Sequence, residues 1–130
     1  MIKQIKSSEI KNYIKENLDV VLLDVRTEHE WNSLGKPKAE DLNSKTYFVT
    51  VSPDLSNWQV PDPNFVKNVK KIINKDQKIL VMCAAGGRSM IAANLLAAEG
   101  YSTLNVSDGY SGNGQDPGWK NSGLPSIIDN

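Results

Sequence analysis

The sequence contains one cysteine, one histidine and no net charge. A single cysteine cannot form a disulfide within the chain, and one cysteine with one histidine is too few for the usual zinc sites. Fifteen Lys and Arg residues balance fifteen Asp and Glu residues, so no broad basic surface is predicted for nucleic acid or for an anionic membrane. We therefore expect neither a metal nor another cofactor, and no nucleic-acid partner.

Long apolar runs are also missing. No segment is long enough to cross a bilayer, and the first residues lack the apolar core of a signal peptide. These absences favour the reducing cytoplasm and predict no membrane partner. A chain of 130 residues has the length of one domain and can bury a core without disulfides or metals. We expect residues 1–130 to form that domain, with a glycine-rich C-terminal tail from about residue 107.

Short strand-like runs alternate with helix-like runs along the chain. The strand-like runs are residues 2–6, 20–25, 47–51, 78–82 and 103–106, and the helix-like runs are residues 8–18, 28–34, 64–74 and 90–99. This alternation predicts an α/β fold, in which a mainly parallel sheet carries helices on both faces. Ligands bind such sheets beyond the carboxyl ends of the strands.

Local signals set the expected helix ends and faces. Ser7 or Ser8 can cap the first helix, and a capping box, Thr27 to Glu30, begins the second. Apolar spacing predicts two buried helical faces, formed by Ile10, Tyr13, Ile14 and Leu18 in the first helix and by Phe65, Val69, Ile72 and Ile73 in the third.

The only cysteine lies in a turn between a strand-like run and a helix-like run. The turn reads Cys83, Ala84, Ala85, Gly86, Gly87, Arg88 and Ser89. Its glycines allow successive backbone N–H groups to converge on an anion, and the helix that follows adds the positive end of its dipole. Such a setting favours the thiolate, which is the reactive form of cysteine. We therefore predict that Cys83 is a nucleophile and that residues 84–89 bind its substrate.

Several residues in this turn and elsewhere in the sequence have competing interpretations. Cys83 could instead be a small buried apolar residue, although the turn around it favours an anionic ligand. Arg88 could bind the oxyanion of a donor or pair with a carboxylate that braces the turn. Ser89 is expected to cap the helix. Asp24 and Arg26 are expected to tie neighbouring loops together, and His29 has no assigned role.

Three aromatic residues are also ambiguous. Trp58, Tyr110 and Trp119 could fill the core, or they could surround the opening of a pocket and contact an acceptor. Packing in the core is the commoner role of aromatic residues in a small domain.

Several motifs occur together along the chain. They are Leu22-Leu23-Asp24-Val25-Arg26-Thr27 followed by Glu30-Trp31, the loop Cys-x-x-Gly-x-Arg-Ser at 83–89, and Ala92-Ala93-x-x-Leu96-x-x-x-Gly100-Tyr101. Together they resemble the rhodanese-like sulfurtransferases, and the similarity spans nearly the whole domain. Residues 35–40 depart from the family's usual pattern. The resemblance implies a five-stranded parallel sheet flanked by helices.

The resemblance also implies a reaction. Cys83 attacks the outer sulfur of a small-molecule donor such as thiosulfate, and sulfite leaves behind a persulfide on the cysteine. A thiol, cyanide or a protein acceptor then takes this sulfur. A sulfur carrier or protein-binding module of the same family, with little turnover of free thiosulfate, is the alternative.

Loop length bears on a third alternative. Only four residues separate Cys83 from Arg88, whereas tyrosine-phosphatase-type sites have five between the corresponding residues. The shorter loop offers fewer N–H donors to a tetrahedral oxyanion. It therefore favours sulfur transfer over phosphatase or arsenate reductase chemistry.

Overall fold

The computed structural model describes residues 2–128 and contains a five-stranded parallel sheet. The strands lie side by side in the order β1-β6-β5-β2-β4. Their bounds are Lys3–Ile5 (β1), Val20–Asp24 (β2), Thr46–Phe48 (β4), Lys78–Met82 (β5) and Ser102–Val106 (β6). All neighbouring pairs in this sheet are parallel. The predicted α/β fold and its five-stranded parallel sheet are confirmed.

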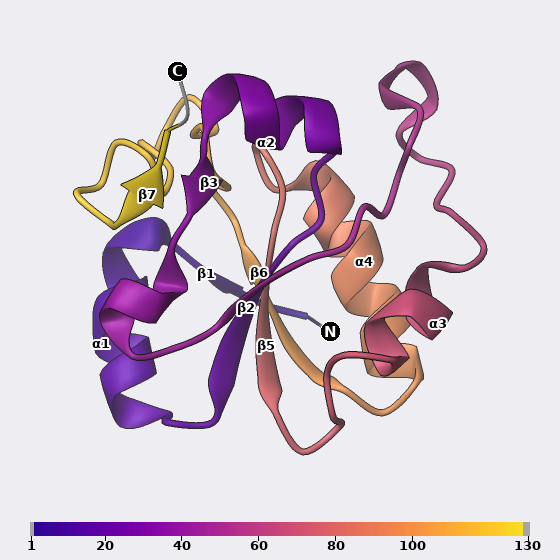
Figure 1. Ribbon diagram of the computed structural model, residues 1–130, viewed down its shortest axis with the longest axis horizontal. Coiled ribbons are helices and arrows are strands. Elements are labelled where there is room, and N and C mark those ends of the chain that lie inside the picture. Colours follow the sequence, from indigo (N-terminus) through magenta and orange to yellow (C-terminus); the bar gives the residue numbers. More distant parts are fainter. Residues whose placement is uncertain (1, 129–130) are drawn as a thin grey trace.

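Helices cover both faces of this sheet (Figure 1). Helix α1 (Ser7–Glu16) lies on one face, and α3 (Phe65–Lys70) and α4 (Gly87–Ala98) lie on the other. Helix α2 (Glu28–Leu34) lies beyond the carboxyl end of β2. Two short 3-10 helices, η1 (Ala39–Leu42) and η2 (Leu55–Asn57), belong to the connections.

Alternating side chains of the inner strands form two separate cores. Val21 and Leu23 of β2 pack with Phe65 and the residues of α3 and α4, whereas Leu22 packs with Ile10 and the residues of α1. All five residues of β2 are buried, as expected of a parallel strand that is covered on both faces.

Some predicted element ends are wrong. Helix α1 ends at Glu16, so Leu18 falls outside it and is 85% exposed. Helix α3 ends at Lys70, which leaves Ile72 44% exposed. Strand β4 covers only Thr46–Phe48 instead of residues 47–51. The predicted serine cap is also wrong, because Lys6 occupies the N-cap position.

Ser7 contacts the C-terminal tail instead of capping its helix. Its backbone N–H and its hydroxyl donate hydrogen bonds to Asp108 Oδ1 at 3.0 and 2.9 Å. The other carboxylate oxygen, Oδ2, accepts from the N–H of Gly118 at 3.0 Å. Asp108 therefore joins the start of α1 to the tail.

The tail belongs to the packed core rather than being an irregular extension. Tyr110 and Trp119 are fully buried in the α1 core. The tail also adds a strand that the sequence analysis missed, β7 (Ser126–Ile127), which pairs antiparallel with β3 (Lys36–Pro37). Within residues 2–128, every helix is too short or too polar to cross a membrane.

Candidate active site

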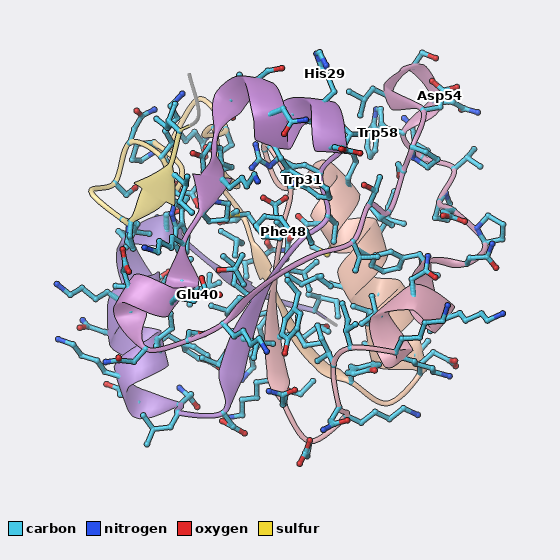
Figure 2. All side chains as sticks on the ribbon, in the orientation of Figure 1. His29, Trp31, Glu40, Phe48, Asp54 and Trp58 are labelled. Atoms are coloured by element: carbon cyan, nitrogen blue, oxygen red, sulfur yellow. The ribbon has the colours of Figure 1, made fainter. Side chains whose placement is uncertain are left out.

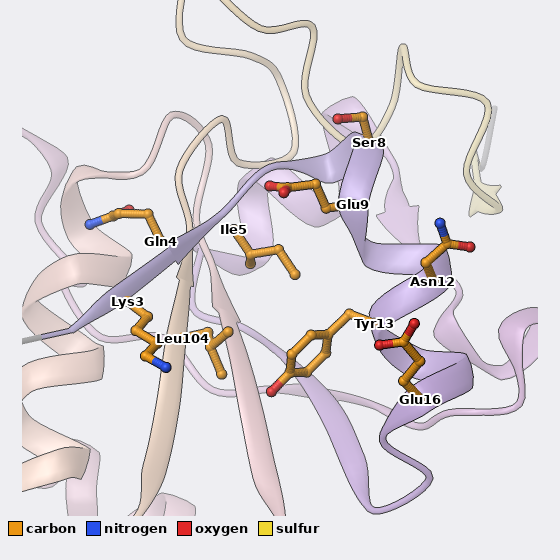
Figure 3. Close-up of a pocket in the computed structure, with 9 residues that line it drawn as sticks. All are labelled: Lys3, Gln4, Ile5, Ser8, Glu9, Asn12, Tyr13, Glu16 and Leu104. Atoms are coloured by element: carbon orange, nitrogen blue, oxygen red, sulfur yellow. The ribbon is translucent and has the colours of Figure 1, made fainter.

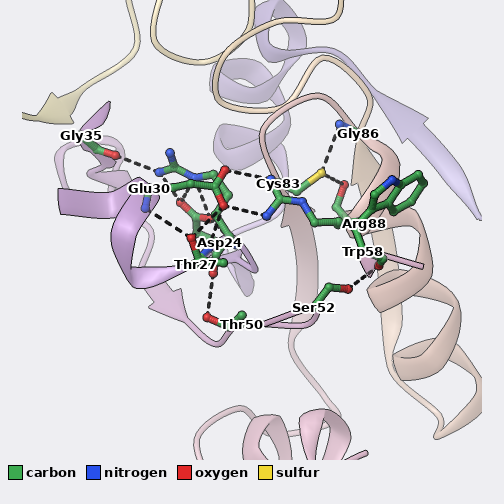
Figure 4. Close-up of polar contacts among 12 residues, drawn as sticks. Asp24, Thr27, Glu30, Gly35, Thr50, Ser52, Trp58, Cys83, Gly86 and Arg88 are labelled. Atoms are coloured by element: carbon green, nitrogen blue, oxygen red, sulfur yellow. Dashed lines mark hydrogen bonds and ion pairs between the residues drawn. The ribbon is translucent and has the colours of Figure 1, made fainter. Parts of the chain in front are cut away.

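Cys83 follows β5 directly and lies at the carboxyl end of the sheet. Its side chain is 1% exposed. Gly86, at the N-cap of α4, has a φ of 101°, a left-handed conformation that glycine adopts without strain. This conformation directs the Gly86 N–H toward the cysteine, and it donates to Cys83 Sγ at 3.2 Å (Figure 4). The turn therefore supplies one backbone donor to the sulfur.

A cavity of about 220 Å³ opens over the cysteine. It is lined by Trp58, Cys83, Ala84, Ala85, Gly87 and Arg88. The structure thus places all of residues 83–89 around the Cys83 sulfur. Four of them line the cavity together with Cys83. Gly86 donates a hydrogen bond to the sulfur, and the Ser89 hydroxyl lies beside it.

The prediction that Ser89 caps the helix is wrong. Gly86 is the N-cap residue and α4 begins at Gly87, so Ser89 already lies in the first turn. Its hydroxyl donates to Asn105 Oδ1 at 2.5 Å, and the Cys83 thiol donates to the Ser89 hydroxyl at 3.3 Å. Ser89 therefore connects the sulfur to β6.

Asn105 is a site residue that the sequence analysis missed. Its side-chain amide donates to Gln4 Oε1 at 2.8 Å and to the Gly86 carbonyl at 3.1 Å. These two bonds turn its oxygen toward Ser89. The only sequence signal for this residue is its position near the end of the last predicted strand.

Arg88 pairs with a carboxylate, so the structure selects one of its two predicted roles. Its Nη1 and Nη2 donate to the two carboxylate oxygens of Glu30 at 2.7 and 2.9 Å. Both side chains are 10% exposed. This bidentate pair joins the first turn of α4 to α2, and it braces the cysteine loop.

The ion pair has a clear effect on the Glu30 carboxyl. Burial by itself would raise the pKa of Glu30, but hydrogen bonds from Arg88 and Thr27, together with the charge of Arg88, lower it to about 2. The Arg88 pKa moves in the opposite direction. Burial would lower the pKa of Arg88, whereas the hydrogen bond and charge of Glu30, with smaller effects of Cys83 and Asp24, raise it. The pair is therefore charged at neutral pH.

The other predicted charged pair, Asp24 and Arg26, lies at the carboxyl end of β2. Both side chains are fully buried, and Arg26 Nη2 lies 2.8 Å from Asp24 Oδ2. The same nitrogen donates to the Gly35 carbonyl at 2.9 Å, and the guanidinium lies 4.1 Å from the Tyr110 ring centroid. These contacts tie the end of β2 to α2 and the tail, which is the structural role expected of this pair.

The three ambiguous aromatic residues divide between the two interpretations. Tyr110 and Trp119 belong to the core, whereas Trp58 is 38% exposed and lines the cavity over Cys83. The buried Ser52 donates from its hydroxyl to the Trp58 carbonyl at 2.6 Å, which fixes the backbone there. His29 is exposed on α2 and points away from the molecule (Figure 2).

Comparison with known proteins identifies the family. The family model for the rhodanese-like domain matches residues 7–114. This chain belongs to the rhodanese-like domain family. The expected family is thereby confirmed.

Relatives of this rhodanese-like domain include proteins of similar length. It is 38% identical over 128 residues to Uncharacterized protein RP600 of Rickettsia prowazekii, a match that covers 96% of this chain and 97% of that protein. It is 33% identical over 89 residues to Thiosulfate sulfurtransferase 18 of Arabidopsis thaliana, covering 68% of this chain and 62% of that protein. The crystal structure of Rv0390 from M. tuberculosis superposes with a TM-score of 0.83 at 25% identity, over 98% of each chain.

The tail of this rhodanese-like domain supports the cysteine loop from behind. The N–H groups of Tyr110 and Ser111 donate to the carbonyls of Cys83 and Ala84 at 2.8 and 2.9 Å. Gly109 has a φ of 60°, and a Cβ there would overlap the Ala84 carbonyl. A glycine at this position therefore lets the two backbones approach, a role that the sequence analysis missed.

A larger cavity, of about 440 Å³, lies between β1 and α1 (Figure 3). None of residues 83–89 lines it, and its walls include Lys3, Glu9, Tyr13 and Glu16. The cavity of about 220 Å³ is the candidate site because Cys83 lines it. Among residues 2–128, no three His, Cys, Asp or Glu side chains are grouped so that they could hold a metal ion.

Proposed function

We propose that this rhodanese-like domain transfers a sulfane sulfur through a persulfide on Cys83. The observation that carries the proposal is the position of Cys83 Sγ. It lies at the N-terminal end of α4, accepts a hydrogen bond from the Gly86 N–H at 3.2 Å and borders a cavity. Helix N-termini and backbone donors stabilise sulfur anions, so the same contacts serve the thiolate and the persulfide.

The reaction has two displacement steps. The Cys83 thiolate attacks the outer sulfur of the donor, an S–S bond forms on Cys83, and the donor's own S–S bond breaks. With thiosulfate the leaving group is sulfite. A thiolate or cyanide then attacks the outer sulfur of the persulfide and releases Cys83 as its thiolate. Each attacking nucleophile is already an anion, so no general base is required.

The geometry supports sulfur transfer more strongly than phosphoryl transfer. Both terminal nitrogens of Arg88 are bound to Glu30, so this guanidinium does not offer a free bidentate contact to a phosphate. Only four residues separate Cys83 from Arg88. The loop fits a single sulfur atom better than a phosphate-sized anion.

Steady production of thiocyanate from a sulfane donor and cyanide tests this function. The wild type should turn over, and Cys83→Ser should lose at least about a thousandfold in rate, because a serine hydroxyl stays protonated at neutral pH. Turnover that survives in Cys83→Ser would overturn the proposal. A protein that accepts sulfur on Cys83 but forms thiocyanate only at the background rate would instead be a sulfur carrier.

A further inference from the structure

We infer that the sulfur donor is a low-molecular-weight organic persulfide, R–S–SH, rather than thiosulfate, and that Trp58 is the residue that selects it. This inference rests on the proposed function, since it names the substrate class of the same site. Two independent observations support it: the charge balance of the cavity and the apolar wall that Trp58 provides.

The first observation is that the cavity offers no unpaired cation. Of the residues that line it, only Arg88 carries a positive charge, and both of its terminal nitrogens are bound to Glu30. Thiosulfate carries two negative charges and must approach a thiolate. Like charges repel strongly in a partly buried site, so a cavity without a free side-chain cation disfavours a dianion more than a donor of lower charge.

The second observation is the apolar character of the cavity walls. Trp58, Ala84, Ala85 and Gly87 present carbon atoms to the space over Cys83. The Trp58 ring lies so close to Gly87 that a Cβ on that glycine would be 3.4 Å from it. The face of an aromatic ring packs against the organic group of a ligand, whereas it offers no positive charge to the oxygen atoms of thiosulfate.

Trp58 lies where it can select the sulfur donor at the opening of the cavity. The residue is 38% exposed, and its carbonyl is held by the buried Ser52 hydroxyl at 2.6 Å (Figure 4). One side of the indole therefore faces the cavity while part of it remains open to solvent. The volume of about 220 Å³ is smaller than that of most drug-binding pockets, which suits the sulfur end of a small thiol.

The corresponding step balances without a further reactant. The Cys83 thiolate attacks the outer sulfur of R–S–SH, the donor's S–S bond breaks, and R–S⁻ leaves. The new S–S bond forms a persulfide on Cys83, which keeps the proton of the transferred sulfur. One thiolate is consumed and one is released, so no external oxidant or reductant takes part.

The test compares the rates at which two donors load sulfur onto Cys83, followed by intact mass under single-turnover conditions. Cysteine persulfide should load the wild type at least about tenfold faster than thiosulfate, a factor typical of local charge effects on association. Equal rates, or faster loading by thiosulfate, would overturn the inference while leaving the proposed function intact. Failure of both donors to load Cys83 would overturn both.

Two pairs of variants test whether Trp58 and the lack of a free cation cause the preference between the two donors. Trp58→Ala should slow loading by cysteine persulfide about tenfold without slowing loading by thiosulfate, and Trp58→Phe should keep most of the wild-type rate. Ala85→Lys places a free cation at the cavity and should speed loading by thiosulfate about tenfold, whereas Ala85→Gln should not. Circular dichroism confirms that each variant is folded. Equal effects of Trp58→Ala on both donors, or equal effects of the two Ala85 variants on thiosulfate, would contradict the inference.

Discussion

At the scale of single residues, Cys83 is placed by short-range contacts. The N–H that reaches its sulfur belongs to Gly86, three residues later, and the hydroxyl beside it belongs to Ser89. Such contacts follow from the local turn, so the sequence could predict that Cys83 and the loop around it form the candidate site. The partners of Asn105 and Arg88 are distant in the chain, and no local pattern predicts them.

The sequence could not predict whether Arg88 binds a substrate or braces the loop. A guanidinium binds a substrate oxyanion and a carboxylate of the protein equally well, and the sequence does not indicate which will be near. The sequence analysis assigned Glu30 only to a capping box with Thr27. The structure confirms that box and gives the same carboxylate a second partner, Arg88, 58 residues away.

A first prediction concerns the pH dependence of this ion pair. The folded-state pKa of Glu30 is lowered from 4.5 to about 2, so its stabilising contribution is fully present above about pH 4.5 and is lost as pH falls toward 2. Glu30→Gln should lower the free energy of unfolding by about 2 kcal/mol near neutral pH. The difference between wild type and variant should shrink below about pH 4.

Chemical denaturation at two pH values, near neutral and near pH 3, measures this difference. Glu28→Gln is the matched control, because Glu28 is exposed on the same helix, and it should change stability little at either pH. A gap between wild type and Glu30→Gln that is equally large at both pH values would show that the charge of Glu30 is not what stabilises the loop.

At the scale of elements, the sequence predicted which helices and strands form better than it predicted where each of them begins and ends. Within residues 2–128, each strand of the main sheet and each α-helix overlaps a predicted run. Apolar patterns predicted most of them, whereas the capping box from Thr27 to Glu30 predicted α2. The observed ends of helices differ from the predicted ends where a local capping signal competes with contacts to distant parts of the chain. Ser7 has the chemistry of a cap, yet Asp108 takes both of its donors from another part of the fold.

A second prediction separates the two glycines of the cysteine loop. Gly86 has a φ of 101°, and a Cβ there would overlap the Ser107 carbonyl, whereas a Cβ on Gly87 would make an ordinary 3.4 Å contact with Trp58. Gly86→Ala should therefore destabilise the protein by at least about 2 kcal/mol. Gly87→Ala should be neutral or stabilise by up to about 1 kcal/mol, because alanine favours a helix.

The free energies of unfolding of the two variants, measured side by side, check this prediction. Nearly equal values for Gly86→Ala and Gly87→Ala would contradict the conformation that directs the Gly86 N–H at the sulfur. The Gly86 N–H donates to Cys83 Sγ in that conformation, so sulfur loading should also be slower in Gly86→Ala than in the wild type.

At the scale of the whole molecule, the C-terminal tail completes the fold around the site. Its glycines predicted irregular backbone, and the positive φ angles at Gly109, Gly112, Gly114, Gly118 and Gly123 confirm that part of the prediction. The sequence did not indicate that this segment would bury Tyr110 and Trp119 or support the cysteine loop. Such packing depends on contacts between distant parts of the chain, which local periodicity does not record.

A third prediction tests how firmly the tail is attached. Asp108 accepts bonds from Ser7 through one oxygen and from Gly118 through the other. Asp108→Asn keeps the shape but turns one acceptor into a donor, so one side loses its bond and the protein should lose about 2 kcal/mol of stability.

Asp116→Asn serves as the control for this substitution. Asp116 lies in the same tail and makes a partly exposed ion pair with Lys6 at 3.8 Å, which should contribute less than about 1 kcal/mol. Thermal or chemical unfolding of both variants measures the contrast. An Asp108→Asn protein as stable as Asp116→Asn would mean that the tail is held by its apolar contacts alone.

The most direct test of the account is the intact mass of the protein after exposure to a sulfane donor and removal of the excess. Cys83 is the only cysteine, so a persulfide can form at one position. The intact mass of the wild type should increase by the mass of one sulfur atom, and cyanide should remove this increase. Cys83→Ser should gain nothing. A wild-type protein that stays unmodified with both cysteine persulfide and thiosulfate, or a Cys83→Ser variant that gains sulfur, would contradict the assignment of Cys83 as the sulfur-carrying residue.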